Sequence, residues 1–316
     1  MLNARCSPTY VFAGFLEAGK STWIQAFLES EEINRYERVL LLVCESGETE
    51  YRPERFRSEH VQLCEIEAPE DLNAEMLLEL AEQYRPNRTI IEYNGMWDLG
   101  QLLSALPACY QLAEITTVID GERFAPYFMN LRPSFADKLR HSHRLIVNRP
   151  EGAFDRNRFL EITAAAAPKA DVFYCDEEEQ LTRERRTLNA YRLSASGSDT
   201  LIVPNDAYAA VYRELLHGEE RYDGRAIQVQ GRLIRSAAGE RMIGRYVMIC
   251  CMDDLAFSGL ACELPEGAAV PDDSWVTATG RIRFAFSKSY AGRGPILLAE
   301  ALRLTDAPAD EIIYIQ

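Results

Sequence analysis

The stretch Gly14-Phe-Leu-Glu-Ala-Gly19-Lys20-Ser21 matches the pattern GxxxxGKS/T of a phosphate-binding loop. A strand-like segment, Thr9–Phe12, precedes it, and a helix-forming run, Thr22–Leu28, follows it. Chance would produce this pattern in a chain of this length about one time in a hundred. In a strand–loop–helix context, backbone N–H groups face the phosphates. The stretch therefore predicts that the protein binds a nucleoside triphosphate with Mg²⁺.

The residues of this loop have different expected roles. Lys20 supplies a positive charge to the β- and γ-phosphate oxygens, and the Ser21 hydroxyl ligates Mg²⁺. The other residues expected to contact the nucleotide here are Gly14, Glu17, Ala18, Gly19 and Thr22.

Around the loop, short apolar runs alternate with helical patterns up to about residue 180. The expected strands are 10–12, 39–44, 61–64, 89–92, 115–119, 145–147 and 172–174, and the clearest helices are 22–28, 71–83 and 156–165. Buried, β-branched strands that alternate with helices are typical of a doubly wound, mostly parallel sheet. We therefore predict a P-loop NTPase domain of α/β class over residues 1–180.

The rest of the chain has a different texture. Residues 181–200 follow an acidic run and are expected to form a polar connector with a surface helix. Beyond a helix near 206–216, five strand-like segments follow, split by Gly and Pro turns: 227–234, 245–251, 258–264, 275–286 and 296–304. Five strands in about 90 residues predict a small antiparallel barrel of OB type over residues 201–316.

Composition limits the class of protein. The chain has 316 residues and a formal net charge of −15, which disfavours binding to nucleic acid or anionic membranes. No apolar run approaches the ~18 residues of a membrane span, and no signal-peptide pattern opens the chain. We expect a cytoplasmic protein that is not itself a membrane protein. Its eight cysteines are then reduced thiols or metal ligands.

With these features in place, residues 8–180 resemble the CobW-like family of P-loop GTPases, whose loop reads GFLGAGKTT. Here the loop reads GFLEAGKST, with Glu17 in place of a glycine. Cys44-Glu45-Ser46-Gly47-Glu48 resembles the family's NEFGE switch segment, and the resemblance implies that Glu45 reaches the magnesium shell or a second metal. The alternative is a solvated acidic loop.

Two further segments resemble family motifs at strand ends. Ile90-Ile91-Glu92-Tyr93-Asn94-Gly95 resembles IIETSG, which implies that Glu92 holds the magnesium waters as a catalytic residue beside Lys20, and that the Gly95 amide meets the γ-phosphate. Thr117-Val-Ile-Asp120 resembles the VVD strand end, where Asp120 has either a site role or a structural one.

Residues 144–151, Arg-Leu-Ile-Val-Asn-Arg-Pro-Glu, resemble DRIVLNKTDL, which contains the guanine-reading motif NKxD. Asn148 is retained, Arg149 replaces the lysine, and Glu151 stands where an aspartate accepts hydrogen bonds from guanine. The resemblance implies GTP as the nucleotide, and the altered motif leaves ATP open as the alternative.

Members of the family often carry CxCC after the third strand and act as metal-insertion chaperones or zinc-homeostasis GTPases. Here the matching residues are Cys64-Glu65-Ile66-Glu67, with His60 nearby. Cys64 with His60 and one of the two glutamates would form a site for zinc or a harder ion. The alternative is a buried strand cysteine with surface glutamates.

Residues 201–316 resemble the C-terminal domain of permease subunits of the YcgQ type. The resemblance rests on Tyr222-Asp-Gly224, Trp275 with Gly280, and the core Ile243-Gly-Arg-Tyr-Val-Met-Ile-Cys-Cys251 with Asp254. The double cysteine Cys250-Cys251 has either a metal or redox role or a packing role, because adjacent strand residues point to opposite faces.

Three functions remain open at this stage. The first is a slow, Mg²⁺-dependent GTPase coupled to zinc homeostasis or to metal delivery to a client protein. The second is a nucleotide-gated regulatory or adaptor module of a membrane permease system, without metal cargo. The third is an ATP-dependent small-molecule kinase, which only the altered guanine motif suggests.

Overall fold

The computed structural model describes residues 7–45, 47, 50–152, 154–176, 180–184, 200–205, 207–248, 255–268 and 270–314. Of these, the residues up to Arg156 and from Ala170 to Glu184 form one compact unit, and those from Asn157 to Lys169 and beyond Glu184 form another. Glu48, Cys250, Cys251 and Asp254, named from the sequence, lie outside the described residues.

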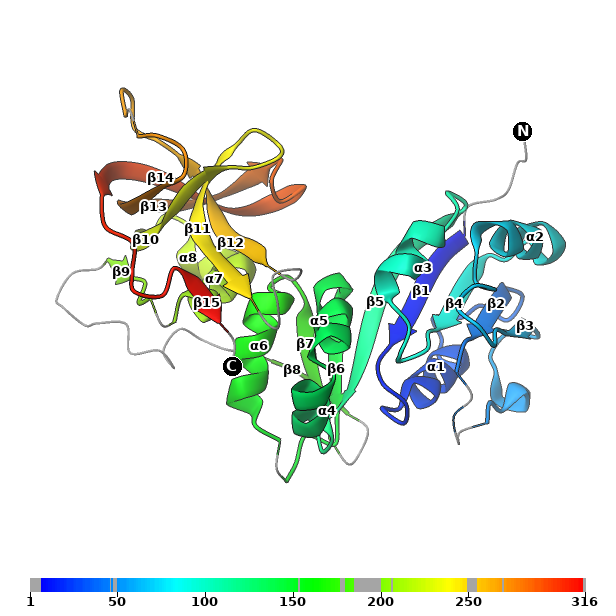
Figure 1. Cartoon of the computed structure of the whole chain (residues 1–316). Helices are drawn as coiled ribbons and strands as arrows, with labels where there is room; N and C mark the ends of the chain where they lie inside the picture. Colours follow the sequence, from blue (N-terminus) through cyan, green and yellow to red (C-terminus); the bar gives the residue numbers. More distant parts are fainter. Residues whose placement is uncertain are drawn as a thin grey trace. The chain divides into compact units, whose positions relative to one another are not determined.

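An eight-stranded sheet in the order β3-β2-β4-β1-β5-β6-β7-β8 forms the centre of the first unit, and Figure 1 shows β1, β4 and β2 side by side. The strands are β1 Ser7–Ala13, β2 Arg38–Val43, β3 His60–Glu65, β4 Arg88–Glu92, β5 Tyr110–Asp120, β6 Arg144–Asn148, β7 Asp171–Cys175 and β8 Leu181–Arg183. The first seven pair in parallel, and β8 is antiparallel to β7. The predicted mostly parallel P-loop sheet is confirmed.

Helices cover both faces of this sheet. They are α1 Lys20–Glu29, the 3-10 helix η1 Pro53–Arg55, α2 Ala74–Tyr84, α3 Leu99–Ala105, α4 Phe124–Asn130 and α5 Arg132–His141. Alternate residues of β2 face opposite sides: Leu41 packs with α1, and Leu42 packs with α2 and α3. Burial on both faces explains why these strands read as continuous apolar runs.

The sheet positions the ends of four strands on one edge. Glu92 ends β4, Asp120 ends β5 and Asn148 ends β6, and the loop after β1 leaves the sheet between β4 and β5. The register pairs Phe12 with Glu92, and Asp120 with Asn148. Ligands of open parallel sheets bind at such an edge, outside the carboxyl ends of the strands.

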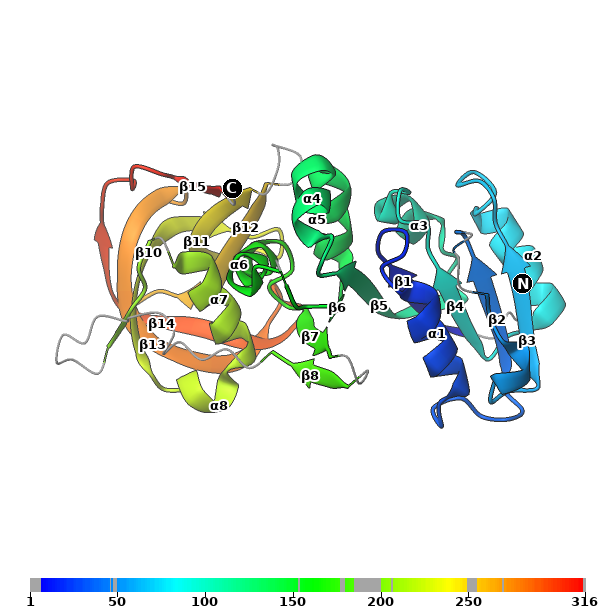
Figure 2. The ribbon, with the colours of Figure 1, turned by 90° about the horizontal axis from the view of Figure 1, so that it is seen from below.

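The second unit contains α6 Arg156–Ala166 from Asn157 onward, and then β9 Leu201–Ile202, α7 Tyr208–His217, α8 Glu219–Tyr222, β10 Ala226–Arg235, β11 Arg241–Met248, β12 Ala256–Glu263, β13 Ser274–Ser287, β14 Gly292–Leu304 and β15 Ile312–Tyr314. Strands β10 to β14 close on themselves, because β11 pairs with β10 as well as with β12. The curved strands of this barrel surround α7 in the view of Figure 2.

The barrel is five-stranded with a Greek-key return, as in an OB fold. The meander β10-β11-β12 is followed by the hairpin β13-β14, and β13 returns to pair with β10. The expectation of an antiparallel barrel is wrong at one seam, since β14 pairs in parallel with β12. Closing five strands in this order brings two strands of the same direction together.

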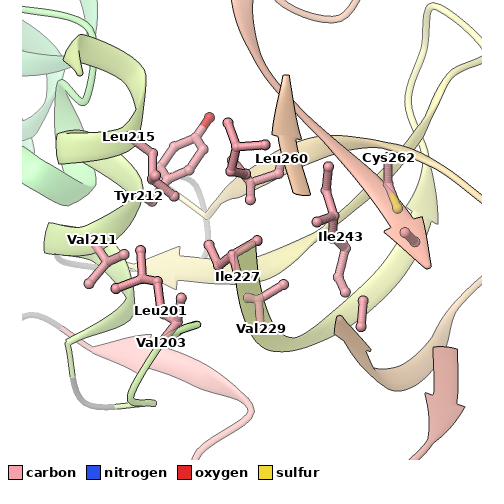
Figure 3. Packing of buried hydrophobic residues seen from close by; sticks show 14 of the residues in the cluster. Leu201, Val203, Val211, Tyr212, Leu215, Ile227, Val229, Ile243, Leu260 and Cys262 are labelled. Carbon is pink, nitrogen blue, oxygen red and sulfur yellow. The ribbon is translucent and has the colours of Figure 1, made fainter. Parts of the chain in front are cut away.

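A single apolar cluster fills the barrel. Val211, Tyr212 and Leu215 of α7 face Ile227 and other inward residues of the strands, as Figure 3 shows. Helix α7 therefore closes the barrel as a plug.

Two other points concern the sequence predictions. The polar connector predicted for residues 181–200 begins as strand β8, and the surface helix expected there falls on residues mostly outside those described. Among the helices of the described residues, none has the length and apolar character needed to cross a membrane.

Candidate nucleotide-binding site

The loop between β1 and α1 adopts a backbone that depends on its glycines. Gly14 has φ 133° and Gly19 has φ 102°, which side-chain-bearing residues rarely adopt. Space is also limiting: a Cβ on Gly14 would lie 2.2 Å from the Val118 carbonyl oxygen, and a Cβ on Gly19 would lie 2.5 Å from Asn148 Nδ2. The two glycines let the backbone turn closely against the strand ends and aim its N–H groups outward.

Lys20, the first residue of α1, folds back over the loop. Its Nζ donates hydrogen bonds to the carbonyl oxygens of Gly14 at 2.8 Å and Phe15 at 3.1 Å, and its side chain is only 3% exposed. An ion pair with Glu45 supplies its counter-charge. The ammonium group is thereby fixed above the loop, as its predicted role requires.

Glu45 connects the two groups that were expected to meet the terminal phosphate. One carboxylate oxygen pairs with Lys20, and the other accepts a hydrogen bond of 3.1 Å from the Gly95 N–H. The Glu45 carboxylate therefore bonds both donors, and its predicted place in the magnesium shell stays a prediction.

Ser21 and Glu92 form a hard-oxygen pair of the kind that Mg²⁺ prefers. Ser21 Oγ donates to Glu92 Oε1 at 2.6 Å, and Glu92 is 3% exposed. The donor set fits a magnesium ion held by the Ser21 hydroxyl and, directly or through water, by the Glu92 carboxylate.

Tyr51 is a site residue that the sequence analysis missed. Its hydroxyl donates to the other Glu92 oxygen at 2.6 Å. Burial and the negative charge of Glu92 raise the pKa of Tyr51 well above its usual range, so the phenol remains a donor. No local motif marks this tyrosine; its only signal is that it follows the Glu45 segment.

Lys20, Ser21, Glu45 and Glu92 line one cleft of about 390 Å³, within the size range of about 300–1,000 Å³ for ligand sites. Its walls are Leu16, Glu17, Gly19, Lys20, Ser21, Thr22, Glu45, Gly47, Glu92, Asp120, Glu122, Arg123 and Arg149. Of the predicted nucleotide and magnesium residues, the cleft contains Glu17, Gly19, Lys20, Ser21, Thr22, Glu45 and Glu92. Asp120 and Arg149, which the family motifs also pointed to, lie on its wall, and Arg123 is a lining residue that the sequence analysis did not name.

Glu17 has left-handed backbone geometry, with φ 62°, which costs a non-glycine residue about 1 kcal/mol or more. Two arginines hold it. Arg123 forms an ion pair with its carboxylate, and Arg149 Nη2 donates to its main-chain carbonyl at 3.0 Å. Both arginines also face buried Asp120, Arg149 at 2.7 Å and Arg123 at 3.6 Å. Asp120 is therefore the anchor of a charge network.

Two residues of the altered guanine motif, Asn148 and Glu151, lie in different surroundings. Asn148 binds the loop: Nδ2 donates to the Ala18 carbonyl at 2.7 Å, and Oδ1 accepts from Trp23 Nε1 at 3.0 Å. Glu151, by contrast, is exposed and does not line the cleft. Its role as a base reader stays a prediction.

The proposed set of His60, Cys64 and a neighbouring glutamate is not brought together. Because β3 is extended from His60 to Glu65, four residues along it separate His60 from Cys64 by about 13 Å. Adjacent Cys64 and Glu65 point to opposite faces. Burial raises the pKa of the Cys64 thiol. Within the described part of the chain, no three His, Cys, Asp or Glu side chains form a metal-sized group.

Comparison with known proteins is consistent with this geometry. Residues 8–173, more than half of the chain, match the CobW/HypB/UreG nucleotide-binding domain family. Residues 178–315 match the DUF1980 C-terminal domain. No curated protein matches the chain.

Among solved structures, Zn(II)-bound YjiA GTPase from E. coli is 16% identical over 73% of this chain and 74% of that one, with a TM-score of 0.41. HypB from Archaeoglobus fulgidus is 12% identical over 54% and 82%, with a TM-score of 0.39. HypB from Helicobacter pylori in complex with nickel is 15% identical over 53% and 78%, with a TM-score of 0.37. By the family match to its P-loop unit, the chain belongs to the CobW/HypB/UreG family of nucleotide-binding domains.

Proposed function

We propose that this protein binds GTP together with Mg²⁺ and hydrolyses it. The observation that carries the proposal is the convergence of Lys20, Ser21 and Glu92 in one cleft at the carboxyl ends of the central strands. Each provides a group that phosphoryl transfer needs, and the glycines leave room for the phosphates. Family membership supports the same reading for the nucleotide-binding step.

The side chains divide the work as follows. Lys20 and the loop N–H groups neutralise and orient the β- and γ-phosphates, and the Gly95 N–H is placed to donate to the γ-phosphate. Ser21 and Glu92 hold Mg²⁺, whose chemistry is to withdraw charge from the phosphate oxygens. Glu45 must release Lys20 and Gly95 before both can serve the phosphate, because its carboxylate bonds them in the structure.

The decisive experiment measures phosphate release by the full-length chain with GTP and Mg²⁺. Lys20→Ala is expected to reduce turnover by at least about a hundredfold, the scale of losing one preorganised charge in a reaction site. Lys288→Ala, an exposed lysine in the other unit, is the matched control and should leave turnover unchanged. Equal turnover in the wild type and Lys20→Ala would refute the proposal. Competition between GTP and ATP separates it from the kinase alternative.

We further propose that the cycle serves metal homeostasis, with zinc delivered to a client protein in the cytoplasm. Family resemblance motivates this role. Cys64 is the one thiol of the segment that resembles the family's CxCC, and it is tested without His60, which β3 holds away from it. Elemental analysis of purified wild type and Cys64→Ala, with buried Cys109→Ala as the control, tests it. Stoichiometric zinc in the wild type and in Cys109→Ala, but not in Cys64→Ala, supports the role. If Cys64→Ala retains the zinc, Cys64 is not a ligand for the metal.

The second candidate is a nucleotide-gated adaptor of a membrane permease system, without metal cargo. The observation that favours it is geometric. The extended strand β3 keeps His60 apart from Cys64, and within the described part of the chain no three His, Cys, Asp or Glu side chains form a group that could hold a metal ion. Hydrogen exchange in the presence and absence of Mg–GTP, each with and without zinc, distinguishes the two. Nucleotide-dependent protection of the barrel that is indifferent to zinc supports the adaptor, whereas protection that requires zinc supports metal delivery.

A further inference from the structure

The phosphate-binding loop of this chain contains a carboxylate, Glu17, on the wall of the cleft that Lys20 also lines. Its side chain is 39% exposed and is ion-paired with Arg123, which is 48% exposed and lines the same cleft. Arg123 belongs to a different part of the fold: it precedes α4, after the end of β5. Folding therefore places a cation from the β5 end directly against the anion in the loop.

We propose that Arg123 is a charge-compensating positioning residue, which neutralises Glu17 so that the loop accepts a triphosphate. The inference rests on the proposed nucleotide site and adds to it a residue outside the P-loop, Glu92 and guanine motifs. It assigns Arg123 its effect through Glu17, not through a bond of its own to the nucleotide.

Electrostatics requires such compensation. A bound triphosphate carries several negative charges a few ångströms from the loop, and at that distance an uncompensated carboxylate opposes binding even in a partly solvated cleft. Lys20 is already shared with Glu45 and with two carbonyl oxygens, so it is not available to screen Glu17. Arg123 is the cation that contacts the Glu17 carboxylate among the described residues.

The backbone contacts support the same assignment. Arg149 binds the Glu17 carbonyl and Asp120, and so holds the left-handed residue from the main-chain side. Arg123 binds the side chain and lies 3.6 Å from the same Asp120. Asp120 thus orients both arginines. Arg149 holds the backbone conformation of Glu17, and Arg123 neutralises the Glu17 carboxylate. The separation of these tasks makes the charge testable without disturbing the backbone.

The test is a double-mutant cycle in the full-length chain, with the Kd for Mg–GTP and Mg–ATP measured by calorimetry. Arg123→Ala is expected to weaken binding about tenfold at low salt, and less at high salt, because partly exposed charges are screened. Glu17→Gln should bind as well as the wild type or better. The double variant should return to within about threefold of the wild type, since the charge that needs compensation is gone.

Arg35→Ala is the matched control, because Arg35 forms a half-exposed pair with Glu59 and does not line the cleft. It should leave both Kd values unchanged. Arg123→Lys should retain most of the affinity, since it keeps the charge, and thermal melting of each variant shows whether it is folded.

Two results overturn the inference. An Arg123→Ala variant that binds like the wild type shows that no compensation is needed. A double variant that stays as weak as Arg123→Ala shows that Arg123 acts on the phosphates directly or on the fold. Lys20→Ala distinguishes a failure of this inference from a failure of the proposed nucleotide site. If Lys20→Ala also binds Mg–GTP like the wild type, the nucleotide site itself is wrong. If Lys20→Ala loses binding, the site stands and only the role of Arg123 is refuted.

Discussion

The ammonium group of Lys20 and the carboxylate of Glu45 form a buried ion pair between two segments 25 residues apart in the chain. Glu45 also accepts the Gly95 N–H. The two donors expected to bind the γ-phosphate are therefore bonded to one carboxylate of the protein, which competes with the nucleotide for them. If the competition exists, replacing the Glu45 carboxylate should make nucleotide binding tighter and not weaker.

Glu45→Gln is expected to tighten binding of Mg–GTP by about tenfold, because the neutral amide competes less strongly for Lys20. Equilibrium titration with a fluorescent GTP analogue measures the change. If Glu45 instead ligates magnesium or a second metal, as its resemblance to the switch segment implies, the same substitution weakens binding and raises the Mg²⁺ concentration required. Glu59→Gln, in an exposed pair, controls for the loss of one surface charge.

Tyr51→Phe tests the magnesium site through the second carboxylate oxygen of Glu92. The Tyr51 hydroxyl donates to Glu92, so its removal frees one carboxylate oxygen for the ion. The Mg²⁺ concentration for half-maximal nucleotide binding should fall, and the free energy of unfolding of the P-loop unit should fall by about 1 kcal/mol for the lost hydrogen bond. Exposed Tyr36→Phe should change neither quantity. A higher Mg²⁺ requirement would mean that the hydroxyl orients Glu92 for the ion.

These relationships show which parts of the site sequence alone can predict. The phosphate loop is contiguous, so its fold and the roles of Lys20 and Ser21 follow from a local pattern. Glu92 ends one predicted strand of a parallel sheet and Asn148 directly follows another, and such strand ends meet at one edge. Tyr51 reaches Glu92 and Arg123 reaches the cleft from segments between strands and helices. Nothing in their local sequence indicates where such a side chain will lie.

Two other predictions failed for reasons of geometry. The grouping of His60 with Cys64 assumed that closeness in sequence means closeness in space, but an extended strand separates them. The barrel was expected to be antiparallel, because five short strands follow one another within about 90 residues. Its closure pairs β12 with β14, whose parallel direction only the complete topology fixes.

Glu151→Ala tests the predicted base reader. If Glu151 accepts hydrogen bonds from the guanine edge, the substitution should weaken GTP binding by about tenfold or more and leave ATP binding unchanged, because only guanine offers those donors. The measurement is the ratio of the two Kd values, with exposed Glu54→Ala as the control. An unchanged ratio would mean that other groups select the base and that Glu151 is a surface residue without a role in base recognition.

Lys138 of α5 contributes a pH dependence to the stability of the P-loop unit. It is 1% exposed, its Nζ donates to Ser134 Oγ at 2.9 Å, and it lies 5.2 Å from the Phe15 ring centroid. Burial lowers its pKa from 10.5 to about 8, with Lys20 adding to the effect and nearby carboxylates opposing it. Between about pH 8 and pH 10.5 the unfolded chain binds more protons at this site than the folded one, so stability rises with pH in that window.

Lys138→Met removes this term while keeping an unbranched side chain of similar length. At pH 7, where both states of the wild type are protonated, the variant should be more stable by about 1–3 kcal/mol, because no charge is buried. The advantage should shrink toward zero near pH 10. Native-state hydrogen exchange of β1 and β4 reads the P-loop unit alone, and exposed Lys288→Met should not change it. A destabilised variant at pH 7 would mean that the bond to Ser134 and the contact with Phe15 outweigh the burial of the charge.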